Sequence, residues 1–529
     1  MTAADVRRWI GALAIIAVVL VFPDNPWDFD VPGLAHAPWE LVVIVLLPRV
    51  LPQHLWTWAR PIMAGILTLT TIIKVANVVA LQGFGRPVAP LADLALVPTA
   101  LGTLAMNNRL IAIAAVAGAA VLVAAVAAAT WWALGVLGRI SRGRVWLPVA
   151  AGLMVVTVAL SFVTTGDPPI AIGNAATSRL MRDQAVALEV YLRDMRAFRH
   201  ELEQPENPKT PALLSGLRGT DVLVVFIESY GRSALERAPY DAIVRPALDQ
   251  STQALTAAGF HASSAWLTSP TFGGESWLAH STVTSGLPVT TDPRYRALIN
   301  SNRSTLVGDF KRAGWRTTVV MPEITLPWPE IDFFGFDAVY TALNLGYRGP
   351  PFGYMTMPDQ YVLHAFNTRE LAKADRPPLM AEIALISSHI PWAPIPRMVP
   401  WSDIGDGAIF ATARTPKTAR EEWADPARVP VIYAETLEYV LQAVTSFITT
   451  YGSDNTLVIL MGDHQPMGFI AGEGASHQVP VHLIARDETL LRALDGGSWA
   501  AGMTPASTGP VMGMDALRAH IVTTFTPRE

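Results

Sequence analysis

Polar side chains of the types that bind metal ions follow three short apolar runs of the sequence. Glu228 ends the run "VLVVFIE", and Asp463 and His464 end the run "LVILMGDH". A third run, "MAEIALISSHIPW", leads through two serines to His389. Two carboxylates and one imidazole nitrogen suit one divalent cation, Zn²⁺, Mn²⁺ or Mg²⁺. An acid after a strand is also a common helix cap, so the prediction of a metal site depends on the set as a whole.

The segment "FGGESWLAHSTVTSG" contains a serine, Ser276, with two possible roles. As an isolated motif it is typical of a helix N-cap, whose hydroxyl accepts a bond from the helix backbone. However, Gly273 and Gly274 permit unusual backbone angles and the close approach of a ligand. A helix start beside a metal would also activate the hydroxyl as a nucleophile. We therefore favour the nucleophile, with Thr271 and Ser281 as the alternative hydroxyls.

The elements that must position these residues form the second half of the chain. From residue 219 onward, short apolar runs alternate with helical stretches, which predicts an α/β domain with a largely parallel sheet. The runs are "DVLVVFI", "RTTVVM", "MAEIALIS", "NTLVILM" and "VPVHLIA". Ligands of such sheets gather at the carboxyl ends of the strands. We therefore expect the candidate residues to meet at one edge of the sheet.

The first part of the chain reads as a membrane domain. Hydrophobic residues make up 51% of the 529 residues and charged residues only 16%, against about 25% charged in a soluble domain. We expect a helical transmembrane domain over 1–166, an amphipathic helix and linker over 167–218, and a catalytic domain over 219–529. About five apolar runs approach the ~20 residues that cross a bilayer: 9–23, 39–58, 62–82, 110–137 and 145–165.

Charge and composition set the orientation and exclude some classes of protein. Basic residues flank the predicted spans on one side, and the loop 24–38 carries aspartates without Lys or Arg. The positive-inside rule then places the amino terminus inside and everything after residue 166 outside the cytoplasm. The net charge of −5 gives no drive toward nucleic acid, and the absence of cysteine excludes disulfides and thiolate metal sites.

The order of these motifs resembles the alkaline phosphatase and sulfatase superfamily. The shared order is a glutamate at a strand end, a hydroxyl after a glycine turn, then Ser-His-x-Pro and Gly-Asp-His. Five membrane spans before an external catalytic domain resemble its lipoteichoic acid synthase and phosphoglycerol transferase branch. The likeness is specific over 219–485 and architectural before that. It implies a multi-pass protein of a bacterial-type cell membrane, with a three-layer αβα catalytic domain on the periplasmic or outer side.

The resemblance also implies roles for individual residues. Four of them match the family's ligands for one metal ion, and the serine is also its nucleophile: Glu228, Ser276, Asp463 and His464. His389 matches a substrate-binding histidine. His477, in "ASHQVPVHLI", and Trp328, in "LPWPEIDFF", are expected on the substrate side. The implied reaction moves a phospholipid head-group phosphate, with phosphatidylglycerol as the suggested donor, to a glycan or lipid acceptor.

This sequence departs from the family's patterns at several points. The branch that it resembles uses a threonine nucleophile, whereas here the residue is serine; both offer an activated hydroxyl. "SPTFGG" lacks the arginine of the motif from which sulfatases make their formylglycine, which disfavours sulfate-ester hydrolysis. Zero cysteines argue mildly against the phosphoethanolamine transferases. Two alternatives stay open: a membrane-bound hydrolase of the sulfatase or phosphatase type, and a catalytically silent membrane scaffold.

Overall fold

The computed structural model of the protein describes residues 2–29, 37–94, 97–140, 152, 155–156, 158–159, 163–165, 170–171, 173–204, 212–353 and 355–527. It divides into two compact units. The first comprises Met1–Gln82 and Arg86–Ala197, and the second Gly83–Gly85 and Phe198–Glu529. The domain limits that we expect from the sequence, at residues 166 and 218, stay predictions.

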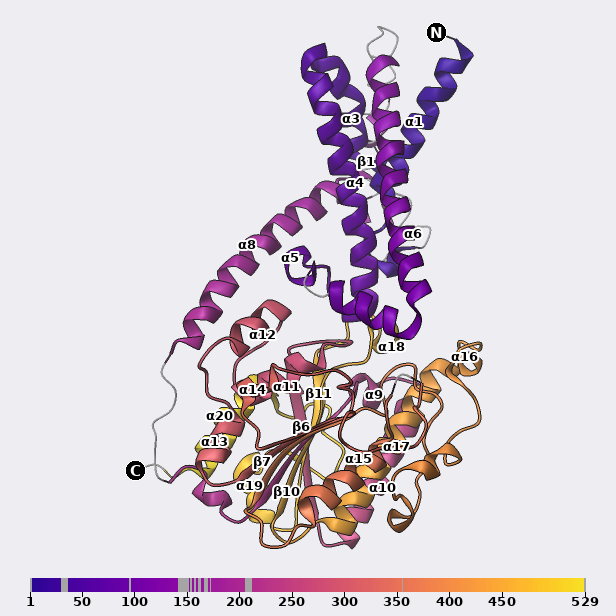
Figure 1. The fold of residues 1–529 in the computed structure, drawn as a ribbon. Helices are drawn as coiled ribbons and strands as arrows, with labels where there is room; N and C mark the ends of the chain where they lie inside the picture. The colour runs from indigo at the N-terminus through magenta and orange to yellow at the C-terminus, as the bar shows by residue number, and fades with distance from the viewer. Residues whose placement is uncertain are drawn as a thin grey trace. The chain divides into compact units, whose positions relative to one another are not determined.

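The first unit is mainly helical (Figure 1). Its elements are α1 Ala3–Val21, η1 Pro26–Asp28, β1 Ala37–Pro38, α3 Trp39–Val50, α4 Gln53–Phe84, α5 Pro90–Asp93, α6 Val97–Ile140, β2 Thr164–Thr165, β3 Ile170–Ala171, β4 Gly173–Asn174 and most of α8 Ala176–Leu202. Two helical stretches in the described residues are long and apolar enough to cross a membrane, Gln53–Phe84 and Arg109–Ile140. These two stretches indicate a membrane protein.

The expected span 39–58 is wrong as a single helix. α3 has 12 residues and ends at Val50, which is shorter than the ~20 residues of a membrane span. The backbone of Leu51 is extended, with φ −79° and ψ 134°, because the following Pro52 disfavours the helical conformation. α4 then begins at Gln53 and takes in the predicted span 62–82. Most of the predicted span 145–165 lies outside the described residues.

The second unit contains the strands and helices of the expected α/β domain. Its strands are β5 Asp221–Ile227, β6 His261–Thr268, β7 Arg316–Met321, β8 Ala338–Thr341, β9 Leu379–Leu385, β10 Thr456–Gly462, β11 Gln478–Ala485, β12 Ala500–Ala501 and β13 Val511–Gly513. Its helices are α9 Ser233–Glu236, α10 Asp241–Ala257, α11 Ser276–Ser285, α12 Asp292–Ile299, α13 Leu306–Arg312, α14 Ile331–Phe334, α15 Asp359–Phe366, α16 Ala419–Glu422, α17 Arg428–Tyr451, α18 Gly468–Ala471, α19 Glu488–Asp495 and α20 Met514–Phe525. Short helices η3 Ser215–Leu217, η4 Asn367–Leu371, η5 Trp401–Asp403 and η6 Ala408–Ala411 connect them.

The described strands of this unit form one nine-stranded sheet, in the order β12-β6-β11-β10-β5-β9-β7-β8 with β13 beside β6. β10, β5, β9, β7 and β8 are parallel, as the alternation of strands and helices predicts. β11 is antiparallel to both of its neighbours, which the sequence pattern did not indicate. Its first residues therefore lie at the edge where the parallel strands end.

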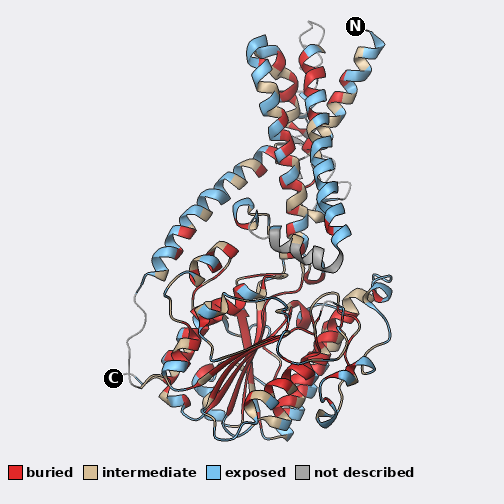
Figure 2. Ribbon diagram, in the orientation of Figure 1, coloured by how far each residue is buried: buried red, intermediate tan, exposed pale blue. Residues whose placement is uncertain are grey.

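Alternating residues of the central strand β5 fill two separate cores. Leu223, Val225 and Ile227 pack with α10, α15 and α17, whereas the intervening valines and Phe226 pack with α11, α13 and α20. Successive strand side chains point to opposite faces of a sheet, so an unbroken apolar run needs cover on both faces. Helices lie on both sides of the buried sheet (Figures 1 and 2). The predicted three-layer αβα class is confirmed.

Candidate active site

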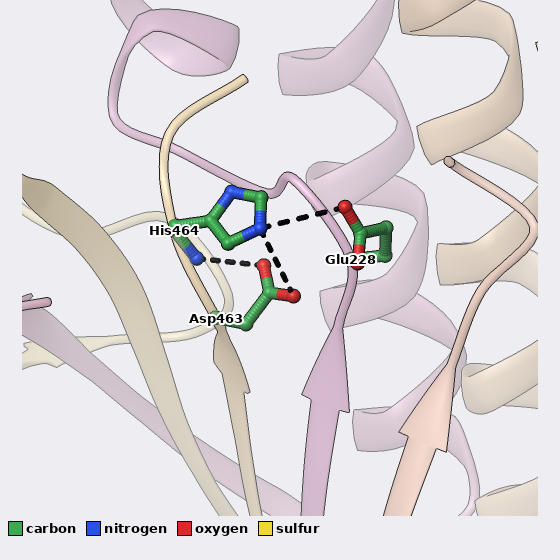
Figure 3. A group of neighbouring side chains, drawn as sticks. All are labelled: Glu228, Asp463 and His464. Carbon is green, nitrogen blue, oxygen red and sulfur yellow. Dashed lines mark hydrogen bonds and ion pairs between the residues drawn. The ribbon is translucent and has the colours of Figure 1, made fainter. Parts of the chain in front are cut away.

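The candidate metal ligands come from two neighbouring strands. Ile227 of β5 and Gly462 of β10 are register partners, so the next residues, Glu228 and Asp463, leave the sheet side by side. Candidate ligand atoms of Glu228, Asp463 and His464 lie within 4.8 Å of one another, and all three residues are buried. Figure 3 shows the three side chains turned toward a common point above the strand ends.

The imidazole of His464 is held in one tautomer. Its Nδ1 lies 2.7 Å from the carbonyl oxygen of Gln465, and because a carbonyl can only accept, Nδ1 carries the proton. Burial also lowers the pKa of His464 and favours the neutral ring. Its Nε2 therefore presents a lone pair, 3.5 Å from Glu228 Oε1 and 3.6 Å from Asp463 Oδ2. An imidazole fixed through its second nitrogen is typical of metal ligands.

The two carboxyl groups repel each other unless a cation or a proton lies between them. Burial and the neighbouring charge of Glu228 raise the pKa of Asp463 well above its ordinary value. The backbone N–H of Ser229 donates to Asp463 Oδ1 at 2.7 Å, and the Ser229 hydroxyl donates to Glu228 Oε1 at 2.7 Å. These donors orient both carboxylates but do not neutralise them. The donor set thus fits one divalent cation, which would supply the missing positive charge.

Ser276 is directed at this set. Its hydroxyl oxygen lies 3.0 Å from Glu228 Oε2 and 3.1 Å from His464 Nε2. α11 begins at Ser276, but its N-cap residue is Glu275, and no side chain caps the helix. The Ser276 hydroxyl therefore does not serve as the helix N-cap, which was its other possible role.

The alternative hydroxyls, those of Thr271 and Ser281, both belong to buried residues. Thr271 is buried and donates from Oγ1 to the carbonyl oxygen of Gly274 at 2.6 Å, inside the glycine turn. Ser281 is buried within α11. Gly273 and Gly274 have φ of 71° and 154°, the positive values that the sequence leads us to expect at this turn.

Strained backbone accompanies the candidate residues. Of five non-glycine residues with positive φ in the described chain, three lie within three positions of a candidate residue: Ser229 (57°), Glu275 (63°) and Trp392 (64°). Positive φ is costly for residues with a side chain and clusters at functional sites. Here it turns the chain sharply after β5, before α11 and in the His389 loop.

His389 belongs to a loop that is tied to Glu228. Ser388 donates from its hydroxyl to the carbonyl oxygen of Glu228 at 2.6 Å, and His389 interacts electrostatically with Glu228. The Nδ1 of His389 lies 2.6 Å from the carbonyl oxygen of Ile390 and donates to it. Its predicted role in substrate binding stays a prediction.

His477 and Trp328 lie in loops at the same edge of the sheet. His477 directly precedes β11; its Nδ1 is 3.3 Å from the carbonyl oxygen of Ser269, and its ring packs against Phe272. Trp328 follows β7, packs against the cluster around Val319 and hydrogen-bonds to Tyr295. Their expected substrate contacts stay predictions.

Sequence reasoning missed Glu323, which follows the end of β7. Although Glu323 keeps exposed surface, the surrounding protein desolvates its carboxyl group and raises its pKa, and the charge of Glu228 acts in the same direction. His280 and His389 act to lower the pKa of Glu323. The signal was present in the sequence, because "RTTVVMPE" is a further apolar run that leads to an acid.

The surface excursion 400–428, to which the sequence assigns no role, reaches the His389 loop. Trp423 stacks on Trp392 with ring centroids 5.6 Å apart and an interplanar angle of 16°. Its indole N–H donates to the carbonyl oxygen of Pro391 at 3.1 Å. Phe469, from the segment after Asp463 and His464, packs edge-on against Trp423. The excursion therefore helps to hold the loop that carries His389.

The fold is an α/β domain whose sheet edge carries a candidate metal site with a serine beside it. A sequence profile described as "Sulfatase" matches residues 220–485, half of the chain. The chain belongs to the sulfatase family, which confirms the predicted superfamily. No curated protein matches the chain in sequence.

Solved structures similar to this chain include a synthase and two transferases. The lipoteichoic acid synthase LtaP from Listeria monocytogenes has 12% identity and a TM-score of 0.41, covering 64% of this chain and 78% of that one. Phosphoglycerol transferase GacH from Streptococcus pyogenes has 12% identity and a TM-score of 0.38, covering 63% and 80%. Lipooligosaccharide phosphoethanolamine transferase A from Neisseria meningitidis has 15% identity and a TM-score of 0.37, covering 61% and 90%.

Proposed function

We propose that the protein is a metal-dependent membrane transferase that moves a phospholipid head-group phosphate to a glycan or lipid acceptor. One observation carries the proposal: the Ser276 hydroxyl lies 3.0 Å from Glu228 Oε2 and 3.1 Å from His464 Nε2. Membership of the sulfatase family and two apolar helices support an enzyme that works at a membrane. The catalytic domain is extracytoplasmic in this proposal.

Each residue has a defined task in the proposed reaction. Glu228, Asp463, His464 and the Ser276 oxygen would hold one divalent ion, Mn²⁺, Zn²⁺ or Mg²⁺. Such an ion lowers the pKa of a bound hydroxyl and offsets charge on phosphoryl oxygens. His389 stabilises charge on the same oxygens, and His477 and Trp328 contact the substrate from the neighbouring loops.

The reaction proceeds in two displacements at phosphorus. The Ser276 oxygen forms a bond to phosphorus while the bond to the lipid alcohol breaks; the alcohol takes up a proton and leaves as diacylglycerol. A hydroxyl of the acceptor then bonds to phosphorus, and the Ser276 oxygen leaves and regains its proton. Phosphatidylglycerol is the proposed donor, by resemblance to the phosphoglycerol transferases.

Full-length protein in phosphatidylglycerol vesicles with Mn²⁺ or Zn²⁺ tests this proposal. We expect diacylglycerol release by lipid mass spectrometry and a head-group phosphate on the peptide that contains Ser276. Ser276→Ala should lower turnover by several orders of magnitude, as loss of a member of a catalytic unit does. Ser276→Thr should keep partial activity, because it keeps a hydroxyl. Removal of the metal with a chelator should abolish turnover, and re-addition should restore it.

Other results would favour the alternatives. Release of phosphate or sulfate from small monoesters, without diacylglycerol, would indicate a hydrolase. Absence of both metal and turnover would indicate a scaffold. Label on Thr271 or Ser281, or near-normal turnover of Ser276→Ala, would exclude Ser276 as the nucleophile.

A further inference from the structure

A carboxylate is buried in the middle of the sheet, outside the candidate metal set. Glu382 lies on β9, pairs with Val224 of β5 on one side and Val319 of β7 on the other, and is 2% exposed. Its neighbours on these strands are apolar and buried. A buried carboxylate of this kind is costly unless it is paired and hydrogen-bonded.

The partner of Glu382 is His280 of α11. His280 Nδ1 lies 2.7 Å from Glu382 Oε1, and both residues are buried. The ring of His280 also packs on Phe226, with centroids 3.9 Å apart. Phe226 is two residues before Glu228 on β5. A single side chain thus joins α11 to the two strands that lead to Glu228 and to His389.

His280 is also placed to control the start of α11. It lies four residues after Ser276, and residues i and i+4 share one face of a helix. Both side chains therefore project from the same side of α11, toward the sheet. N-terminal to Ser276 the chain turns through Gly273, Gly274 and Glu275, all with positive φ, and no side chain caps the helix.

We propose that the Glu382–His280 pair positions the first turn of α11, and with it the Ser276 hydroxyl. The inference rests on the proposed function of Ser276 and adds two positioning residues to it. Neither residue is a catalytic residue in this proposal. They fix the nucleophile relative to Glu228 and His464, where a displacement of about 1 Å costs on the order of 100-fold in rate.

Three variants of full-length protein test this role. Glu382→Leu removes the acceptor of the His280 N–H, and we expect kcat to fall about 10- to 100-fold with KM unchanged. His280→Phe keeps an aromatic ring against Phe226 but loses the hydrogen bond, and should show the same fall. Glu382→Gln keeps an acceptor oxygen and should restore kcat to near the wild-type value.

A matched control separates positioning from loss of stability. Asp221 begins β5 at the opposite edge of the sheet and pairs with Arg376 at 2.6 Å. Asp221→Asn should lower the melting temperature and leave kcat unchanged. If Asp221→Asn and Glu382→Leu lower kcat by the same factor, or if folded Glu382→Leu keeps wild-type kcat, the inference is wrong.

The absorption spectrum of bound Co²⁺ gives a readout that is independent of turnover. Loss of the Ser276 oxygen as a ligand should change the spectrum in Ser276→Ala, and Glu382→Leu should shift it in the same direction. Glu382→Gln and Asp221→Asn should keep the wild-type spectrum. If the Glu382→Leu variant keeps the wild-type Co²⁺ spectrum, the inference is wrong whatever the activity of the variant. If the wild-type protein binds no Co²⁺, both the inference and the proposed metal site are wrong. Co²⁺ binding without phosphoserine formation would contradict only the proposed function.

Discussion

At the scale of single residues, a polar network buried in the sheet has fixed donor and acceptor roles. Tyr230, two residues after Glu228, donates from its hydroxyl to His482 Nε2 at 3.2 Å. His482 Nδ1 then lies 2.7 Å from the Ser264 oxygen, and Ser264 donates to the carbonyl oxygen of Gly502 at 2.6 Å. This hydrogen-bond network gives both ring nitrogens of His482, which is fully buried on β11, a partner. Because Nε2 accepts a hydrogen bond, the network requires the neutral form of this histidine.

This network predicts a specific sensitivity to acid. Burial lowers the pKa of His482 from 6.5 to about 3, so the unfolded chain binds a proton on acidification before the folded protein does. The contribution of neutral His482 to the free energy of unfolding is therefore present above pH 6.5 and is lost as the pH falls toward 3. Between pH 7 and pH 5 the loss is about 2 kcal/mol for this one group.

Thermal unfolding of the full-length protein in detergent, followed at pH 7 and pH 5, measures this effect. His482→Gln removes the titrating group while amide atoms can still meet Tyr230 and Ser264, so the drop in melting temperature between the two pH values should shrink. His261→Gln, at the exposed start of β6, is the control and should keep the wild-type drop. An unchanged drop in His482→Gln would contradict the prediction.

At the scale of elements, three separate loops meet around the candidate site. The His389 loop supplies Trp392, the excursion 400–428 supplies Trp423, and the segment after His464 supplies Phe469; these three rings pack together. Trp392 is fully buried, whereas Trp423 and Phe469 are partly exposed. The excursion, which lies between β9 and β10 in the sequence, thus packs through Trp423 against both loops that carry candidate residues.

Removal of the Trp423 ring should loosen the His389 loop. Aromatic pairs contribute about 0.5–1.5 kcal/mol beyond area burial, so Trp423→Ala should lower kcat/KM about ten-fold. Trp423→Phe keeps the stacking but loses the N–H donor to Pro391, and should give an intermediate value. The measurement is diacylglycerol release at several donor concentrations.

The control for Trp423 lies in the same excursion. Trp401 donates from its indole N–H to the Ser446 hydroxyl of α17 at 2.9 Å, on the side of the excursion that faces this helix. Trp401→Phe should lower the melting temperature and leave kcat/KM unchanged. Equal losses of kcat/KM in Trp401→Phe and Trp423→Ala would show that the excursion matters only for general stability.

At the scale of the whole molecule, the protein joins a helical unit with membrane-type helices to a sulfatase-family domain. The proposed head-group transfer acts on a lipid that lies in the bilayer, and in this proposal the apolar helices hold the enzyme in that membrane. Basic residues at 7, 8, 139, 142 and 144 and acidic residues at 24, 28 and 30 favour an internal amino terminus.

This charge distribution predicts the side of the membrane on which the catalytic domain lies. A reporter enzyme that is active only outside the cytoplasm, fused after residue 529, should be active. The same reporter fused to a chain that ends at residue 142 should be inactive, because that loop is predicted to lie inside. Activity only in the second fusion would contradict the predicted topology.

The sequence by itself determined the features that depend on neighbouring residues. Unbroken apolar runs predict strands that are buried on both faces. Polar residues directly after these runs are predicted to lie at the edge of the sheet, so Glu228, Asp463 and His464 were predictable. The same local logic gives the two apolar helices and the positive φ of Gly273 and Gly274. β6 escaped notice because "HASSAWLT" contains too many small polar residues for an apolar run.

Only the tertiary structure decided which distant groups meet. His280 and Glu382 are 102 positions apart. They lie in the stretches that contain Ser276 and lead to His389, but nothing local indicates that they pair. The antiparallel direction of β11 and the stacking of Trp423 on Trp392 are of the same kind. Local periodicity states that a side chain is buried but not which partner it is buried against. That choice depends on how helices and strands far apart in the chain pack together, because the cost of an unpaired buried polar group is removed only when a distant partner reaches it.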